Sequence, residues 1–242
     1  LPTEDFHLIS SCPCWAYTRR SSRPLTHGTL ASRIVVPSAL WRLNLALGKK
    51  KKYSTEEVME IRAAKLEDIS QIVELQKSCH VSNLDESDKC DGFLNTVMDE
   101  VLLTQVIEQE QAIYVAELNN TIVAMAACAS WKFWECSEGL ISVANKLGSV
   151  VVGSTQLSSS NSYFWGPVCV GKACRGQGVF EKLFRFSCEV RSSKFSYVYT
   201  YVHKDNARSF AAHTNKAGFK YTKDFVLNGQ TFQEMARETK FA

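Results

Sequence analysis

A strand, a glycine-rich loop and a helix follow one another between Tyr163 and Cys188, and this order restricts the fold more than any other part of the sequence. The apolar run YFWGPVCV predicts a strand, with Gly166 and Pro167 in its middle. Proline cannot donate a ladder hydrogen bond and glycine weakens a strand, so we expect this strand to part from a neighbour there. After the loop GKACRGQG, apolar residues recur at helical spacing from Val179 onward.

The rest of the chain from Met59 onward alternates strands and helices in a similar way. Turn signals at Asn119–Asn120 and Asn228–Gly229 predict two hairpins, and Asn206 and Gly218 are a predicted helix cap and helix stop. Residues 135–161 predict an insertion over one face of the sheet, with a short helix in it. The predicted elements are strand 59–64, helices 65–79 and 94–111, strands 112–118, 121–134 and 163–170, helix 179–188, strand 195–203, helix 206–217 and strands 219–227 and 230–238.

The glycine loop matches neither of two common nucleotide-binding motifs. A Walker A motif needs Ser or Thr after Gly-Lys, where Ala173 stands, and a dinucleotide fingerprint needs glycine at the position of Glu181. A glycine turn that leads into a helix nevertheless leaves the first amides of the helix unpaired, where they can bind an anion. With Lys172 and Arg175 beside it, the loop is either an anion site or a basic turn that only starts a helix.

Two motifs together resemble the GNAT superfamily of N-acetyltransferases. VCVGKACRGQGVFEKL resembles the family pattern R/Q-x-x-G-x-G/A, with Arg175 and Gly178 at its first two places and Phe180 where the pattern has Gly or Ala. NARSFAAHTNKAGF, residues 206–219, resembles the second signature of the family. The resemblance covers about Met59 to Glu238. It implies an α/β fold with a mixed, mostly antiparallel sheet, splayed fourth and fifth strands, and helices on both faces.

The resemblance also implies an acetyl-CoA site between the splayed strands. The backbone amides of the loop would cradle the pyrophosphate, and backbone groups of the fourth strand would bind the pantetheine and polarise the acetyl carbonyl. Asn206 and Ser209, at the start of the next helix, belong to the same implied site. The implied cofactor-binding residues are Val168, Cys169, Val170, Arg175, Gly176, Gln177, Gly178, Val179, Phe180, Asn206 and Ser209.

The implied catalytic residues are Asn206 and His213. His213 stands where many family members place a tyrosine that acts as general acid toward the departing thiolate. Histidine can supply a proton near neutral pH, but a packing or capping role stays equally open. His203 is a weaker acid candidate. Four acids are weaker candidates for a general base, and we expect them to be ordinary surface residues: Glu117, Glu135, Asp85 and Glu86. The aromatic candidates, which we expect to pack in the core, are Trp131, Phe133, Trp134, Trp165, Tyr197, Tyr199 and Tyr201.

Charge divides the chain into a basic leader and a mildly acidic domain. Residues up to Lys52 hold nine Lys or Arg against Glu4 and Asp5; the whole chain holds 28 basic and 25 acidic residues, which leaves 19 basic and 23 acidic beyond Lys52. We expect a disordered leader over residues 1–57 and a GNAT domain over 58–242. A domain of this charge argues against nucleic-acid binding. The acid-poor leader resembles a transit peptide, so the expected location is cytoplasmic or, alternatively, organellar.

Cysteine spacing and hydropathy argue against a bound metal and a membrane span. The nine cysteines match neither a disulfide framework nor a metal motif, and no apolar run is long enough to span a membrane. We expect no metal, acetyl-CoA as cosubstrate, an amine acceptor and, as one option, a homodimer. The expected activity is acetyl transfer to a primary amine of a small molecule or peptide by direct attack in a ternary complex. The alternative is an acyl-CoA-binding module without turnover.

Overall fold

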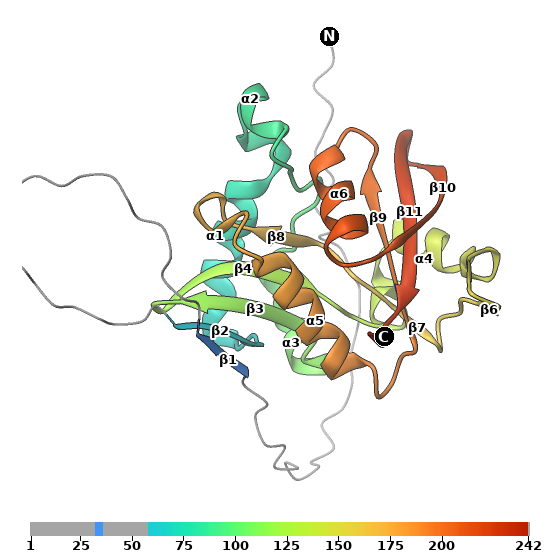
Figure 1. Cartoon of the computed structure of the whole chain (residues 1–242), viewed down its shortest axis with the longest axis horizontal. Coiled ribbons are helices and arrows are strands. Elements are labelled where there is room, and N and C mark those ends of the chain that lie inside the picture. Colours follow the sequence, from blue (N-terminus) through green and yellow to red (C-terminus); the bar gives the residue numbers. More distant parts are fainter. Residues whose placement is uncertain (1–31, 36–57, 242) are drawn as a thin grey trace, which may run out of the picture.

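Two sheets that meet at one strand break form the centre of the protein. The computed structural model describes residues 32–35 and 58–241. Figure 1 shows the two sheets side by side, with the long helix α5 in front of the first. The first sheet has the order β1-β2-β3-β4-β8, and its strands are Ser32–Val35, Val58–Ala63, Ile113–Leu118, Thr121–Ala127 and Val168–Val170.

All neighbouring strands of the first sheet run antiparallel. The hairpin of β3 and β4 turns at Asn119 and Asn120, whose φ values of 51° and 62° place both in the left-handed region, as a two-residue hairpin turn requires. β1 adds an edge strand to β2. It is the part of the predicted leader that the structure describes; the rest of residues 1–57 lies outside the described residues, and so do the expectations for it.

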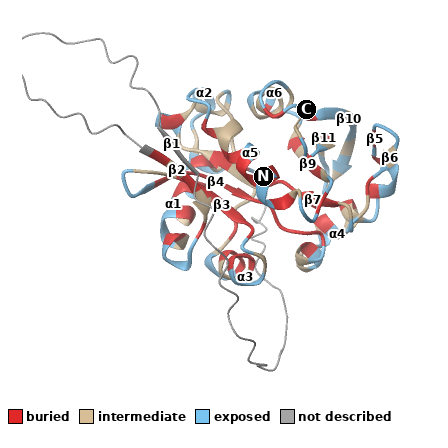
Figure 2. Ribbon diagram, turned by 60° about the horizontal axis from the view of Figure 1, so that its bottom comes forward, coloured by how far each residue is buried: buried red, intermediate tan, exposed pale blue. Residues whose placement is uncertain are grey.

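Helices cover both faces of the first sheet, which is why β4 reads as an almost continuous apolar run. On one face Ile122 and Met125 pack against α1 and α3, whereas on the other Ala124 and Ala126 pack against α5. These helices are Ile69–Cys79, Glu100–Glu110 and Val179–Arg191. Buried residues concentrate in the strands and on the sides of the helices that face them (Figure 2).

The second sheet is mixed and has the order β10-β11-β9-β7. β7 and β9 run parallel, and β9, β11 and β10 run antiparallel. The strands are Ser162–Phe164, Tyr197–His203, Lys220–Leu227 and Gln230–Glu238, and α6, Ala207–Asn215, connects β9 to β10. The mixed, mostly antiparallel α/β architecture with helices on both faces is therefore confirmed.

The segment between β4 and β7 covers one face of the second sheet. It contains α4, Glu138–Ala144, and a small hairpin of β5, Val151–Val152, and β6, Thr155–Gln156. Leu140, Val143 and Leu147 of this segment join the same core cluster as Phe164 and Tyr199 of the second sheet. The predicted insertion over one face of the sheet is thus confirmed.

The connection between α1 and α3 contains a one-turn helix that the sequence did not predict. α2, Glu86–Lys89, has no buried residue. Its chain returns to the core at Leu94, whose amide donates to the carbonyl of Cys79 over 2.8 Å. The acidic stretch expected to be a plain polar connection is therefore held at its end against the C-terminus of α1.

Candidate active site

The strand predicted to break at Gly166 and Pro167 is divided between the two sheets. Its first part, β7, pairs with β9, whereas its second part, β8, pairs with β4. The last contacts across the break are a bond from the amide of Trp165 to the carbonyl of Tyr199 over 2.9 Å and a bond from the hydroxyl of Thr200 to the carbonyl of Trp165 over 2.7 Å. Beyond Trp165, β8 and β9 belong to different sheets, so their facing edges are not paired with each other; this break between the two strands is named here the opening.

The peptide groups of β8 alternate between β4 and this opening. The carbonyl of Pro167 accepts from β4 over 3.0 Å and the amide of Gly171 donates to β4 over 2.8 Å. Because peptide groups alternate along a strand, those of Cys169 also face β4, and those of Val168 and Val170 face the opening. The structure thus brings Val168 and Val170 to the predicted site and directs the backbone of Cys169 away from it.

The opening ends at a loop whose glycines adopt conformations that other residues rarely take. Gly176 and Gly178 both have a φ of +76°, and a Cβ on either would meet no atom within 4 Å. α5 begins at Val179, so the amides of Val179 and Phe180 belong to the first turn of a helix and have no intrahelical acceptor. The loop therefore has both the open space and the positive helix end that a phosphate group needs.

Arg175 holds this loop to β8. Its Nε donates to the carbonyl of Val170 over 3.0 Å, and its Nη2 lies 3.9 Å from the sulfur of Cys79. A hydrogen bond with the Cys169 thiol, together with the nearby guanidinium, lowers the pKa of Cys79 to about 6. The guanidinium thus points into the protein, and Arg175 is a residue that positions the loop. Gln177, at the tip of the loop, is exposed and donates to the carbonyl of Ala173 over 2.9 Å.

Asn206 caps α6 on the opposite side of the opening, as predicted. Its Oδ1 accepts the amide of Ser209 over 3.1 Å, and its Nδ2 donates to the carbonyl of Phe93 over 2.8 Å. The side chain is buried, so both ends of its amide are satisfied within the protein. A ligand that uses this amide must replace one of these partners.

His213 is buried, and both of its ring nitrogens are hydrogen-bonded. Nδ1 lies 2.7 Å from the carbonyl oxygen of Ser209, which only accepts, and Nε2 lies 3.2 Å from the indole N–H of Trp165, which only donates. These partners place the proton on Nδ1. Burial lowers the pKa of His213 to about 4, so the ring is neutral near pH 7. These contacts favour the packing role over the acid role.

Phe180 and His213, the two departures from the family pattern, contact each other. Their ring centroids lie 4.9 Å apart in an edge-to-face arrangement, and Phe180 also meets Trp165 at 6.1 Å. The side chain of Phe180 therefore fills the space between α5 and α6, while its amide stays at the start of α5. The bulky residue does not enter the loop.

The other candidate residues lie where their burial and pairing explain them. Glu117 pairs with Arg62, Glu135 with Lys132 and Glu86 with Lys89. Trp131, Trp134 and Trp165 are buried in the two cores. His203 is half-buried at the end of β9, and its Nδ1 accepts the amide of Asp205 over 3.2 Å.

The remaining candidates follow the same pattern. Phe133 and Tyr197 pack on the core from the surface, and Asp85 is exposed. Tyr199 donates to the buried carboxylate of Glu234 over 3.0 Å. Tyr201 packs among the rings of Phe164, Phe225 and Phe232, edge-to-face with the last two. None of these groups presents itself as a general base.

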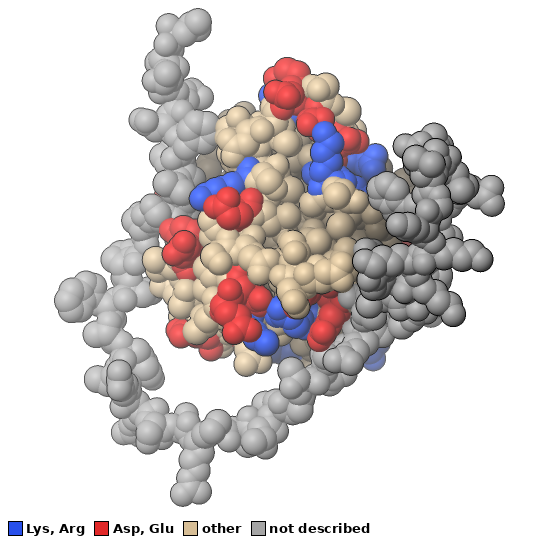
Figure 3. Space-filling view, turned by 90° about the vertical axis from the view of Figure 1, so that its left-hand side faces the viewer, with Lys and Arg blue, Asp and Glu red and all other residues tan. Residues whose placement is uncertain are grey.

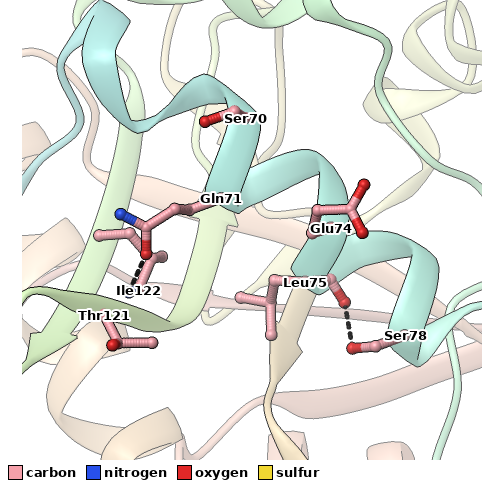
Figure 4. Close-up of a pocket in the computed structure, with 7 residues that line it drawn as sticks. All are labelled: Ser70, Gln71, Glu74, Leu75, Ser78, Thr121 and Ile122. Carbon is pink, nitrogen blue, oxygen red and sulfur yellow. Dashed lines mark hydrogen bonds between the residues drawn. The ribbon is translucent and has the colours of Figure 1, made fainter.

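A separate groove follows α1. It has a volume of about 360 Å³ and lies between α1 and the start of β4, where Gln71 accepts the amide of Ile122 over 3.0 Å (Figure 4). Its lining consists of Ser70, Gln71, Glu74, Leu75, Ser78, Thr121 and Ile122. None of these residues belongs to β8, β9 or the glycine loop, so the groove is distinct from the opening.

The described residues contain no group of three or more His, Cys, Asp or Glu side chains placed to hold a metal ion. Within the same residues, every helix is too short or too polar to cross a bilayer.

Comparison with known proteins identifies a family and a fold. A family model described as the acetyltransferase (GNAT) family matches residues 70–219, which include β8, the glycine loop and α6. Among curated proteins, no relative matches.

Several solved structures resemble the chain. An N-acetyltransferase from Staphylococcus aureus Mu50 is 15% identical with a TM-score of 0.52, covering 75% of this chain and 99% of its own. Ard1 from Thermoplasma volcanium is 14% identical with a TM-score of 0.52, covering 74% and 97%. A proposed acetyltransferase, yncA from Salmonella typhimurium, was solved with its cofactor acetyl-CoA; it is 18% identical with a TM-score of 0.50, covering 75% and 94%.

Proposed function

Because the chain belongs to the GNAT family of acetyltransferases, we propose that it transfers an acetyl group from acetyl-CoA to a primary amine of a small molecule or peptide. The observation that carries this proposal is the free edge of β8, which faces the opening and leads directly to the Gly176–Gly178 loop. An extended pantetheine can pair with such an edge as a further strand does, and its pyrophosphate then reaches the first amides of α5.

Open space at the glycine loop and hydrogen-bonding capacity along β8 support this cosubstrate. The space beside Gly176 and Gly178 is open, and a Cβ at either position would project into it. Val168 and Val170 supply amides on the side of the opening, whereas Pro167 has no N–H to offer. We therefore assign the acetyl carbonyl to the amide of Val168, the pantetheine to the amide of Val170 and the pyrophosphate to the loop from Gly176 to Phe180.

The amide of Val168 is placed to assist the chemistry. It lies next to the strand break, where a thioester carbonyl between the strands can accept its hydrogen bond and so gain partial negative charge during attack. A neutral amine held beside the thioester can then attack directly, because proximity supplies much of the rate enhancement. The acceptor amine loses a proton and the departing thiolate gains one. His213 takes no part in this transfer, because its Nε2 already accepts from Trp165.

A module that binds acyl-CoA without turnover is the second candidate. It rests on Phe180 and His213, which both depart from the family pattern. Since the two side chains pack against each other away from the loop, their departure changes the packing between α5 and α6 and leaves the backbone donors in place. The geometry therefore favours the enzyme.

The test combines an amine panel with a variant that lacks one donor. Wild-type protein should release CoA thiol from acetyl-CoA in the presence of one class among amino acids, polyamines, aminoglycosides and peptides. Val168→Pro removes the amide that faces the opening without removing a bond to β4, and it should lower kcat by about 100-fold. Free CoA has no acetyl carbonyl, so its affinity should change by less than about threefold if the cleft is intact.

Two results would contradict the proposal. Silence across the panel with normal CoA binding would favour the module. An unchanged kcat in the proline variant would remove Val168 from the chemistry.

We further propose that residues 58–242 form the catalytic domain and that the basic leader takes no part in catalysis. Within the described residues, the leader contributes only the edge strand β1 to the first sheet. Nucleic acid is not among the proposed partners. The proposed location is cytoplasmic, or organellar if the leader is a transit peptide, and a homodimer is one option for the assembly.

A further inference from the structure

The acidic segment 85–93, named here the strap, crosses the entrance of the opening from the glycine loop to α6. We propose that the strap is an autoinhibitory element: its carboxylate and carbonyl oxygens bond Lys172 and Arg175 beside the glycine loop and Asn206 and Arg208 on α6, so the phosphates of acetyl-CoA must displace it to reach the loop. This inference rests on the proposed function of the opening.

On the loop side, the strap is bonded to both basic residues that the sequence motif supplies. The carboxylate of Asp88 lies 2.8 Å and 2.9 Å, through its two oxygens, from the Nζ of Lys172. The Nη1 of Arg175 donates to the carbonyl of Asp91 over 2.9 Å. The carboxylate of Asp88 raises the pKa of Lys172, as expected for a close ion pair. The strap thus places anionic oxygens beside the loop that is assigned to the pyrophosphate.

On the other side, the strap is bonded to the start of α6. The Nδ2 of Asn206 donates to the carbonyl of Phe93 over 2.8 Å, and the Nη1 of Arg208 lies 3.7 Å from the carboxylate of Asp91. A Cβ on Gly92 would come within 3.4 Å of the Oδ1 of Asn206, so the strap runs close to the cap itself. The ring of Phe93 also faces His203, with centroids 6.1 Å apart.

The contacts of the strap therefore span both walls of the opening. Residues 88–93 touch the glycine loop through Lys172 and Arg175 and the cap of α6 through Asn206 and Arg208. In Figure 3, acidic and basic side chains gather at the top of the molecule, the end at which Figure 1 places α2.

The strap can move without disturbing the core. α2 has no buried residue, whereas Leu94, just beyond the strap, is buried and bonded to Cys79. The strap is thus fixed at its end, and none of its own residues is buried. Exposed ion pairs contribute little each, so a cosubstrate with several phosphate charges can replace them. The apparent affinity for the cosubstrate is then lower than the affinity of the open form, in proportion to the fraction of molecules in which the strap is open.

The test compares two double variants with the same change in charge. Asp88→Asn with Asp91→Asn removes the carboxylates that face Lys172 and Arg208. Asp85→Asn with Glu86→Gln is the control, because Glu86 pairs with Lys89 inside the strap and Asp85 has no side-chain contact with the loop or with α6. Each protein is titrated calorimetrically with CoA, with adenosine 3′,5′-bisphosphate and with acetyl-pantetheine, which has no phosphate.

The proposal expects the first variant to bind CoA and the bisphosphate about three- to tenfold more tightly than wild type, with less than a twofold change for acetyl-pantetheine. The control should change CoA affinity by less than about twofold. Equal CoA affinity in wild type and both variants would overturn the strap alone. An equal gain in both variants would assign the effect to general charge and also overturn it. No CoA binding by any of the three proteins would overturn the proposed function as well.

Hydrogen exchange distinguishes a competing strap from a clamp that closes over the bound cosubstrate. With saturating CoA, amides of residues 88–93 should exchange faster while those of 176–180 exchange more slowly. Slower exchange in both segments would show that the strap stays closed over CoA, which would overturn the proposal.

Discussion

The two walls of the opening are built in opposite ways. The wall formed by β8 and the glycine loop presents backbone groups: two amides of a strand edge and the first amides of a helix, made accessible by Gly176 and Gly178. The wall formed by α6 presents side chains, and each of these is already engaged, Asn206 with Phe93 and Ser209, His213 with Trp165 and Ser209.

This difference shows where the chain can vary. Binding through backbone depends on conformation, so the loop wall keeps the glycines that its φ values require. Packing through side chains depends on total volume, so the α6 wall accommodates Phe180 and His213 together. Function on the first wall should therefore be sensitive to backbone strain, and stability on the second to changes in buried rings.

The largest expected effect is on the loop wall. Gly178→Val places a β-branched residue at a φ of +76° and fills the open space beside the loop. We expect CoA affinity to fall by about 100-fold, measured by calorimetry, because strain and lost phosphate contacts add. Gly229→Val is a matched control, since Gly229 also has a φ of +76° and open space but lies in the hairpin of β10 and β11. Similar CoA affinities in the two variants would refute the loop as the phosphate site.

A smaller effect is expected from His213, and it concerns stability at low pH. The pKa of His213 is about 4 in the folded protein against 6.5 for the free side chain, so the unfolded chain binds more protons between these values. The stability held above pH 6.5 is therefore lost progressively as pH falls toward 4, by about 2 kcal/mol between pH 7 and pH 5.

The measurement is urea unfolding of wild type and His213→Phe at pH 7 and pH 5. Between pH 7 and pH 5 the free energy of unfolding of the variant should fall by about 2 kcal/mol less than that of wild type. At pH 7 its kcat should change by less than about threefold. A loss of more than tenfold in kcat with normal CoA affinity would return the acid role to His213.

The smallest expected effect is the coupling between Phe180 and His213. Phe180→Ala removes a ring that fills the space against His213, and His213→Tyr restores the size that the family pattern has there. In a double-mutant cycle of unfolding free energies we expect a coupling of about 1 kcal/mol, with the double variant more stable than the sum of the single changes predicts. Additive effects would show that the two departures are independent.

The parts of the fold that could be predicted from the sequence depend on neighbouring residues. The break at Gly166 and Pro167 follows from a missing donor and a missing side chain, the cap at Asn206 from a short polar side chain before a helix, and the hairpin at Asn119 from residues that tolerate a positive φ. Each of these signals acts within a few residues. The resemblance to the GNAT family then predicted a mixed, mostly antiparallel sheet whose fourth and fifth strands splay apart.

What the sequence did not predict depends on residues far apart in the chain. The strap is fixed by the pairing of Asp88 with Lys172, which only the folded chain brings together, and the acidic run alone is also typical of a solvated turn. The role of His213 depends on Trp165, a residue of another element, because burial and that one donor decide where the proton lies. The direction in which the backbone groups of Cys169 point depends on the register between β8 and β4.

The break at Gly166 and Pro167 has a further consequence for the solubility of the fold. An unpaired strand edge is a template on which a second polypeptide can assemble, and many proteins shield their outer edges with charge, bulges or covering segments. Here the break turns the unpaired edge of β8 toward β9 inside the molecule. Under the proposed function this edge pairs with the pantetheine, and because it faces β9 it is less available to a sheet of another chain than an outer edge would be.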